Sequence, residues 1–322
     1  MRYYVTLFDS NYLTRGLVMY RSLRHNAGEF HLWIVCFDDL AYELLHKLKL
    51  EKVTLVSLSQ FEDPELLRIK PDRTQEEYCW TCTPSTILYV LNNEPHVDAV
   101  TYLDADLMFF SSPEPIFTEA SEASILLTEH RYLPESDQSA TSGTYNVQFM
   151  MFCRTPEGLK AVNWWRDRCL EWCFARFEDN KFGDQKYLDD WLVRFDKVHV
   201  LQHLGAGLAP WNAVKYSLKK INESIYVENT PLIFYHFHQL KLQPFYIAHL
   251  GFYPINDNLV SWVYDSYLQE INNAYTEVRA IKPKFNCGIT SFLKPPRRSD
   301  NFYMFLRQTM KYICIGRYRK YA

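Results

Sequence analysis

Glycine is scarce in this chain, which has only 10 among 322 residues. These glycines form neither the phosphate-cradling loop of nucleotide hydrolases nor the sharp turn that carries a hydrolase serine. Long apolar stretches are lacking as well, since none approaches the ~18 residues of a membrane-spanning helix. No apolar segment of the secretory kind precedes the β-like run Tyr3–Phe8. We therefore predict a cytoplasmic protein that uses neither of these two enzyme chemistries.

The eight cysteines follow no pattern of a disulfide framework. Cys36 and several others lie inside apolar runs, which is typical of reduced cysteine that serves as a small hydrophobic side chain. Cys79 and Cys82 are two residues apart, but no second pair stands at zinc-finger spacing. A zinc site or a redox site here is therefore an alternative with little support.

Charge is nearly balanced, at −3, which gives no global electrostatic reason to expect a nucleic-acid partner. Residues 291–322, however, carry eight basic side chains and a single acidic one, Asp300. Apolar residues such as Phe305 and Ile313 stand among them, as in a helix that lies on an anionic membrane surface. We predict peripheral contact with the inner face of the membrane through this tail. A helix docked on the domain is the alternative.

The first third of the chain alternates between strand-like and helix-like segments. Strands are predicted at Tyr3–Phe8, His31–Phe37, Val53–Leu58 and Val97–Leu103, and helices at Tyr12–His25, Ala41–Leu50 and Pro84–Asn92, the last with its proline near the first turn. This order predicts an α/β fold with a mostly parallel sheet flanked by helices. Ligands of such sheets bind beyond the carboxyl ends of the strands, here at Phe8–Tyr12 and Leu103–Phe109.

Beyond residue 110 the alternation is less regular. Further strands are predicted at Ser124–Thr128, Val147–Cys153 and Leu232–His238, a long helix at Glu157–Glu178 and a polar, mobile loop at Pro134–Thr144.

Two aspartates, Asp104 and Asp106, directly follow the buried strand that ends at Leu103. Ionised carboxylates beside a core are costly unless a cation pairs with them. Mn²⁺ and Mg²⁺ accept such hard oxygen ligands together with substrate phosphates. Alternate residues of an extended segment share a face, so both carboxylates would converge on one ion. The motif predicts a divalent-metal site, and two solvated turn aspartates are the alternative.

The segment Leu103–Asp106, with the downstream Ser112-Pro113 and Pro115-Ile116-Phe117, resembles the Asp-x-Asp region of retaining GT-A glycosyltransferases, especially glycosyltransferase family 8 and its relatives. With four further blocks the resemblance covers roughly residues 3–245. It implies a GT-A (Rossmann-like) fold with a mostly parallel mixed sheet. It also implies metal-dependent transfer of a hexosyl group from a UDP-sugar to an acceptor hydroxyl, with retention.

The first block is similar to the strand-to-helix turn that holds the nucleoside in that family. By this resemblance the pocket would be lined by the backbone of Thr6, Leu7 and Phe8, while Asp9 would contact the base and Tyr12 would stack on the uracil.

Two further blocks are similar to the family's sugar-binding segments. Asn146 would contact the donor sugar, although Gln148 stands where the family has glycine. Asp184 would hold sugar hydroxyls, and Gln185 would lie near the anomeric carbon. The basic residue usual before the Asp-x-Asp strand is missing, so Trp80, Thr83 and Ser85 become further candidates for the donor pocket.

The fourth block, Ile233–Lys241, resembles the family's His-Phe-x-Gly-x-x-Lys segment. By this resemblance His236 would complete the metal site with Asp104 and Asp106, and Lys241 would meet the diphosphate; these residues, with Ala105, make up the predicted donor site. His238 is the alternative ligand. Gln239 replaces the usual glycine, and the lysine comes one residue early.

Together these patterns predict a catalytic domain over residues 1–250, with a nucleotide-binding half (1–110) and a half that completes the metal and acceptor sites (111–250). A helical, basic and aromatic extension would follow over 251–322. We interpret the chain as a UDP-sugar-dependent hexosyltransferase with Mn²⁺ or Mg²⁺, acting on a glycan or lipid-linked saccharide in polysaccharide synthesis. A sugar nucleotidyltransferase and a non-catalytic sugar-nucleotide-binding protein are the alternatives.

Overall fold

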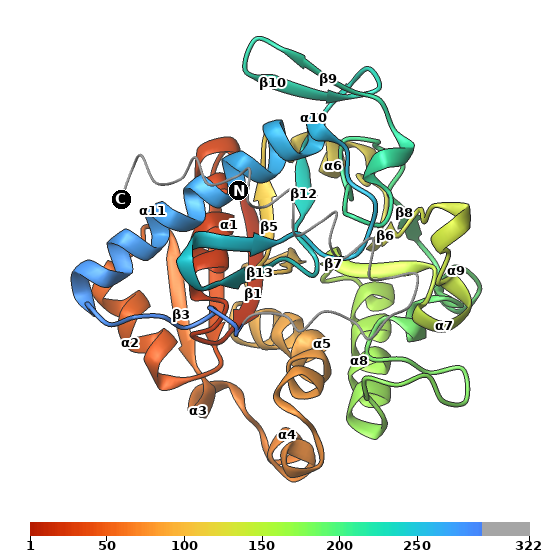
Figure 1. The fold of residues 1–322 in the computed structure, drawn as a ribbon. Coiled ribbons are helices and arrows are strands. Elements are labelled where there is room, and N and C mark those ends of the chain that lie inside the picture. The colour runs from red at the N-terminus through yellow and green to blue at the C-terminus, as the bar shows by residue number, and fades with distance from the viewer. Residues whose placement is uncertain (292–322) are drawn as a thin grey trace.

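The computed structural model describes residues 1–291, apart from the side chain of Tyr246. Within them lies a central sheet of seven strands: β1 (Arg2–Phe8), β2 (Phe30–Cys36), β3 (Val53–Ser57), β4 (Ala99–Leu103), β6 (Ile125–Glu129), β7 (Tyr145–Cys153) and β8 (Val198–Val200). Their order is β3-β2-β1-β4-β7-β6-β8, and only β7 runs antiparallel to its two neighbours (Figure 1). The predicted mostly parallel α/β sheet is confirmed.

The helices and the smaller sheets complete the described chain. The helices are α1 (Leu13–Asn26), α2 (Asp39–Leu48), α3 (Leu58–Phe61), α4 (Pro64–Ile69), α5 (Gln75–Asn93), α6 (Glu114–Glu119), α7 (Ser139–Ser142), α8 (Pro156–Glu171), α9 (Trp191–Arg194), α10 (Asp257–Leu259) and α11 (Asp265–Ile281). Strand β5 (Leu107–Phe109) pairs with β12 (Phe234–His236), β13 (Lys241–Gln243) pairs with β14 (Ile247–His249), and a third small sheet contains β9 (Leu218–Ile221), β10 (Ser224–Val227) and β11 (Thr230–Pro231).

Strand β1 shows why the core has two sides. Its alternate residues face opposite ways, so Tyr4 and Phe8 pack with side chains of α1, α2 and α11, while Val5 and Leu7 pack with those of α5 and α8. All four side chains are buried. The sheet is therefore covered by helices on both faces, and ligands can reach it at its edges.

Helix α5 differs from its prediction. The expected helix Pro84–Asn92 is only the second half of a helix that begins at Gln75, so Pro84 lies inside it. A reciprocal capping box between Thr74 and Glu77 starts the helix early. Because proline has no amide hydrogen, the carbonyl of Trp80 loses its usual helical donor beside the predicted donor pocket.

Three other predicted segments also differ. The predicted helix Glu157–Glu178 ends at Glu171, because Trp172 adopts an extended backbone and is buried with Cys173. The predicted strand Leu232–His238 is shorter in the structure, where β12 spans three residues, Phe234–His236. The polar segment Pro134–Thr144 contains a 3-10 turn and the short helix α7.

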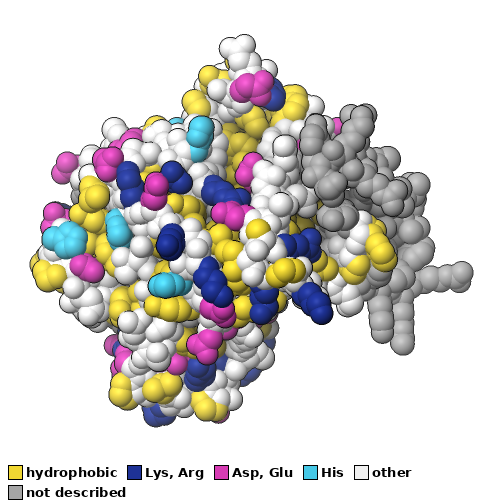
Figure 2. All heavy atoms as spheres, turned by 90° about the vertical axis from the view of Figure 1, so that its left-hand side faces the viewer, with side chains coloured by type: hydrophobic (Ala, Val, Ile, Leu, Met, Phe, Trp, Pro, Cys, Tyr) yellow, Lys and Arg dark blue, Asp and Glu magenta, His cyan; other side chains and the backbone are white. Residues whose placement is uncertain are grey.

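Helix α11 packs along α1 and follows a short π-helix, Val260–Tyr264 (Figure 1). The predicted domain boundary at residue 250 stays a prediction, and the tail from residue 292 onward lies outside the described residues. Among the residues that are described, no helix is both long and apolar enough to cross a membrane. On the side of the molecule seen in Figure 2, basic and acidic side chains are interspersed.

Candidate active site

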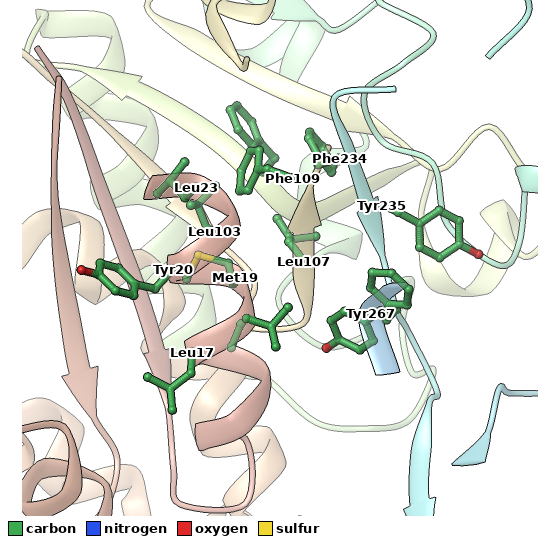
Figure 3. Close-up of a cluster of buried hydrophobic side chains, with 14 of the residues drawn as sticks. Leu17, Met19, Tyr20, Leu23, Leu103, Leu107, Phe109, Phe234, Tyr235 and Tyr267 are labelled. Carbon is green, nitrogen blue, oxygen red and sulfur yellow. The ribbon is translucent and has the colours of Figure 1, made fainter. Parts of the chain in front are cut away.

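The turn that carries Asp104 and Asp106 is held between β4 and β5 by a cluster of buried side chains. Leu103, Leu107 and Phe109 pack in this cluster with Phe234 and Tyr235 of β12 (Figure 3). Antiparallel pairing of β5 with β12 places His236 opposite Leu107. The pairing thus brings a histidine from late in the chain to the end of β4.

Three side chains meet at this point as a possible metal site. The Nε2 atom of His236 lies 3.1 Å from Oδ1 of Asp106 and 3.7 Å from Oδ2 of Asp104. One ligand atom from each residue lies within 4.8 Å of the others, and among residues 1–291 no other group of three or more such residues is found. His238, the alternative ligand, is outside this group.

The two carboxylates converge for a different reason from the one that the sequence suggested. Residues 104–106 are not extended: the amide of Leu107 donates to the carbonyl of Asp104 at 3.4 Å, so the chain turns there. Ala105 sits in the turn between the aspartates and is buried at 6% exposure. A turn, and not a shared strand face, brings the carboxylates together.

Burial and charge give the two aspartates different proton affinities. Burial raises the pKa of Asp104 to about 6, with the charge of Asp106 adding to the effect and His236 opposing it, while the Tyr102 hydroxyl donates to Oδ1 at 3.0 Å. Burial also raises the pKa of Asp106, but the charge and hydrogen bond of His236 outweigh it, and the net shift is downward. In His236 burial lowers the pKa, and the two carboxylates reverse the shift. The group therefore carries concentrated negative charge that a cation would neutralise.

A cavity of about 840 Å³ opens beyond these residues and is lined by parts of all five predicted blocks. This volume lies in the range usual for small-molecule sites. Leu7, Phe8, Asp9 and Tyr12 line the cavity, and Tyr12 is 44% exposed. Thr6 lies in β1, fully buried, and does not line the cavity.

Asp9 is bound chiefly to its own turn. Its Oδ1 accepts hydrogen bonds from the amides of Asn11 and Tyr12 at 2.9 and 3.1 Å, and its Oδ2 accepts from the side chains of Asn11 and Gln75 at 3.0 and 2.5 Å. Tyr12 is the N-cap residue of α1 and makes no side-chain capping hydrogen bond, so Asp9 stabilises the turn before the helix. The carboxylate that was expected to contact a base therefore has four partners within the protein.

The predicted sugar-binding residues also line the cavity. Asp184, Gln185 and Asn146 line it together with Thr83 and Trp80. The side-chain amide of Asn146 donates to Oε1 of Gln185 at 3.4 Å, and that of Gln185 donates to the carbonyl of Ser142 at 2.5 Å. Burial, with the charge of Asp104, raises the pKa of Asp184 to about 7.

Two further candidates, besides Thr6, lie outside the cavity lining. Gln148 is fully buried, and its side-chain amide has no hydrogen-bond partner within the described part of the chain. Ser85 accepts a hydrogen bond from Nε of Arg166 at 3.2 Å and does not face the cavity.

Beyond β12 the chain turns back through Gln239, whose φ is +62°. This turn brings both His238 and Lys241 to the cavity. Burial, with the charge of His236, lowers the pKa of His238 to about 4, so this ring is neutral at pH 7. Lys241 is exposed at the start of β13 and lines the cavity.

The sequence reasoning missed several cavity residues, among them His130, Tyr132 and Trp211. The rings of His130 and Tyr132 stack at 4.5 Å, and the indole of Trp211 lies against the rings of His236 and His238 at 5.4 and 5.2 Å. His130 and Tyr132 follow the carboxyl end of β6, so the strand-end rule could have found them. Trp211 lies in a loop that has no periodic pattern.

Comparison with known proteins gives close relatives and more distant folds. No protein-family model matches the chain. In Bacillus subtilis (strain 168), the uncharacterized protein YfnD is 34% identical over 293 residues, which cover 89% of this chain and 94% of that protein. The uncharacterized protein YfnF is 30% identical over 294 residues, which cover 88% and 96%.

Among solved structures, the galactosyltransferase LgtC in complex with donor and acceptor sugar analogs matches with a TM-score of 0.50 and 12% identity, over 84% of this chain and 95% of LgtC. An active-site mutant of LgtC gives a TM-score of 0.51 and 13% identity over the same shares. At 12% and 13% identity, the similarity to LgtC concerns the fold alone. The chain therefore belongs to the family of YfnD and YfnF, and it has the fold of the GT-A glycosyltransferases.

Proposed function

We propose that the protein is a metal-dependent glycosyltransferase that moves a hexosyl group from a UDP-sugar to a hydroxyl of a glycan or lipid-linked acceptor. The observation that carries the proposal is the grouping of Asp104, Asp106 and His236 at the edge of a GT-A sheet, inside a cavity of about 840 Å³. LgtC, whose fold is similar, is a galactosyltransferase with donor and acceptor sugar analogs bound, which supports a sugar-nucleotide ligand.

The donor set fits a divalent cation. Two carboxylates and one imidazole suit Mn²⁺ better than Mg²⁺, which prefers oxygen ligands alone. Asp104, Asp106 and His236 would hold the ion. When bound, it would neutralise the charge on the donor's diphosphate. Lys241 would add a second positive charge at the same diphosphate.

The other cavity residues would place the donor. Tyr12 would stack on the uracil, and its exposure of 44% supports this role. Asp184 and Asn146 would hold sugar hydroxyls, and Gln185 would lie near the anomeric carbon. All four residues line the cavity.

Retention of the anomeric configuration is the outcome we propose. No protein base is then required, because the departing phosphate can take the proton of the acceptor hydroxyl on the same face of the sugar. Asp184, whose pKa is raised to about 7 by burial and by the charge of Asp104, would be the base of an inverting enzyme. The anomeric configuration of the product, read by NMR, decides between the two.

The proposal is tested by incubating the full chain with a panel of nucleotide sugars and Mn²⁺ and measuring UDP released by slow donor hydrolysis. We expect release from at least one UDP-sugar and its loss on chelation of the metal. If no donor gives metal-dependent UDP, the proposal fails. Release of pyrophosphate from UTP and a sugar phosphate would support a nucleotidyltransferase instead, and binding without turnover would support a sensor.

A further inference from the structure

Arg15, in the first turn of α1, is a buried cation next to the donor cavity. Its side chain is only 5% exposed. The guanidinium carbon lies 4.7 Å from the centre of the Tyr12 ring, in a cation–π arrangement. Tyr12 lines the cavity and Arg15 does not, so the guanidinium supports this ring from the protein side.

The same guanidinium joins two segments that are distant in sequence. Nη1 donates to the carbonyl of Asn11 at 3.2 Å, and Nη2 donates to the carbonyl of Leu240 at 3.1 Å. Leu240 immediately precedes Lys241, and its amide donates to the carbonyl of Phe237, which closes the turn after β12. One side chain thus holds the Tyr12 turn and the Lys241 turn in a fixed relation.

Arg15 has no acidic partner close by. Among residues 1–291 no carboxylate lies within 4.0 Å of its guanidinium, which donates instead to the carbonyls of Asn11 and Leu240. A buried cation held by neutral groups alone is costly, and negative charge nearby reduces that cost.

Charge at the site gives Arg15 a purpose in donor binding. The carboxylates of Asp104 and Asp106 would be matched by a divalent cation, and the diphosphate of a UDP-sugar would bring two further negative charges. Lys241 supplies one positive charge at the cavity, and Arg15 supplies another behind Tyr12.

We propose that Arg15 is a positioning residue that couples the nucleoside end of the donor site to its diphosphate end. It sets the Tyr12 ring and the Lys241 turn together, so that stacking on the base and pairing with the diphosphate reinforce each other. This inference rests on the proposed function, because it takes the ligand to be a nucleoside diphosphate.

The test is isothermal titration of UDP in the presence of Mn²⁺ with the full chain. Arg15→Met keeps length without charge or donors, and we expect it to weaken UDP binding about tenfold, because stacking on the base and pairing with the diphosphate would no longer reinforce each other. Arg15→Lys should fall between Met and wild type, because an ammonium cannot stack on a ring and hold both carbonyls at once. The lysine variant also carries the test if the methionine variant does not fold.

A double-mutant cycle separates coupling from general damage. In the wild-type background the effects of Tyr12→Ala and Lys241→Ala on UDP affinity should be non-additive, and in the Arg15→Met background they should add. A purely structural Arg15 would lower the melting temperature and leave the coupling intact.

Arg154 offers a matched control, because its Nε and Nη2 also donate to two carbonyls, those of Val97 and Glu94, both at 2.8 Å. Arg154→Met should reduce stability without changing UDP affinity. The inference is overturned if folded Arg15→Met binds UDP like the wild type, or if the coupling persists in it. A wild-type protein that binds no UDP with Mn²⁺ would instead overturn the proposed function.

Discussion

Two turns that line the cavity use their carboxylates in opposite ways. In the turn before α1, Asp9 accepts four hydrogen bonds from its own turn and from α5. In the turn between β4 and β5, Asp104 accepts a hydrogen bond from the Tyr102 hydroxyl, and Asp106 lies against His236. Asp9 is buried and satisfied by neutral donors, whereas the side chains of Asp104 and Asp106 are 27% and 13% exposed.

This difference separates scaffold from ligand site. A buried carboxylate with several amide donors has little to gain from a ligand, and its removal costs folding free energy. Paired carboxylates with few donors repel each other and gain from a cation. The comparison therefore predicts that mutation of Asp104 or Asp106 reduces activity, whereas mutation of Asp9 reduces stability.

The largest expected effect is at Asp106. Asp106→Asn should lower metal-dependent UDP release by about 100-fold to 1,000-fold, the range seen when one electrostatic contact of an active site is removed. Steady-state UDP release and Mn²⁺ titration measure it. Asp98→Asn is the control, because Asp98 is exposed and directly precedes strand β4. Full activity in folded Asp106→Asn would mean that the group of Asp104, Asp106 and His236 is not part of the catalytic site.

A smaller effect, on stability, is expected at Asp184. Its native pKa of about 7 lies above its ordinary value of 3.8, because of burial first and the charge of Asp104 second. The native state therefore holds a proton that the unfolded state releases, and this contribution to stability is lost as pH rises from about 4 to 7. Asp184→Asn cannot ionise and should have a flatter stability profile, by on the order of 2 kcal/mol across that window.

Thermal melting of metal-free wild type and Asp184→Asn across this pH series measures the difference. The exposed change Asp98→Asn should follow the wild-type profile throughout. Parallel profiles for the wild type and Asp184→Asn would show that the Asp184 carboxyl is not held protonated in the native state.

The smallest effect on ligand binding is expected at Asp9. Asp9→Asn turns one acceptor oxygen into a donor that faces Asn11 and Gln75, so we expect a loss of about 1 kcal/mol of stability. UDP affinity should fall less than in Tyr12→Ala. Differential scanning fluorimetry and titration measure both quantities. Asp63→Asn, which alters a helix cap outside the cavity lining, is the control. An unchanged melting temperature with lost UDP binding would place Asp9 with the ligand-binding carboxylates.

Local pattern was enough to predict the first half of the fold. Strand β1, helix α1 and strand β4 were foreseen because apolar periodicity and turn residues act over a few positions, and the GT-A resemblance was carried by short blocks. Pro84 misled the prediction because the capping box of Thr74 and Glu77 overrode a proline that is tolerated inside α5. Trp172 ended α8 early because burial outweighed helical continuity.

The candidate site shows the same division. By itself the sequence determined that two carboxylates follow a buried strand, because this needs only the order of residues along one segment. Tertiary structure decided that His236 and not His238 joins them, through the register of β5 with β12. It also decided that Gln148 lies outside the cavity, that Trp211 lines it and that Arg15 connects two turns. Those outcomes depend on contacts between residues far apart in the chain, which no local pattern encodes.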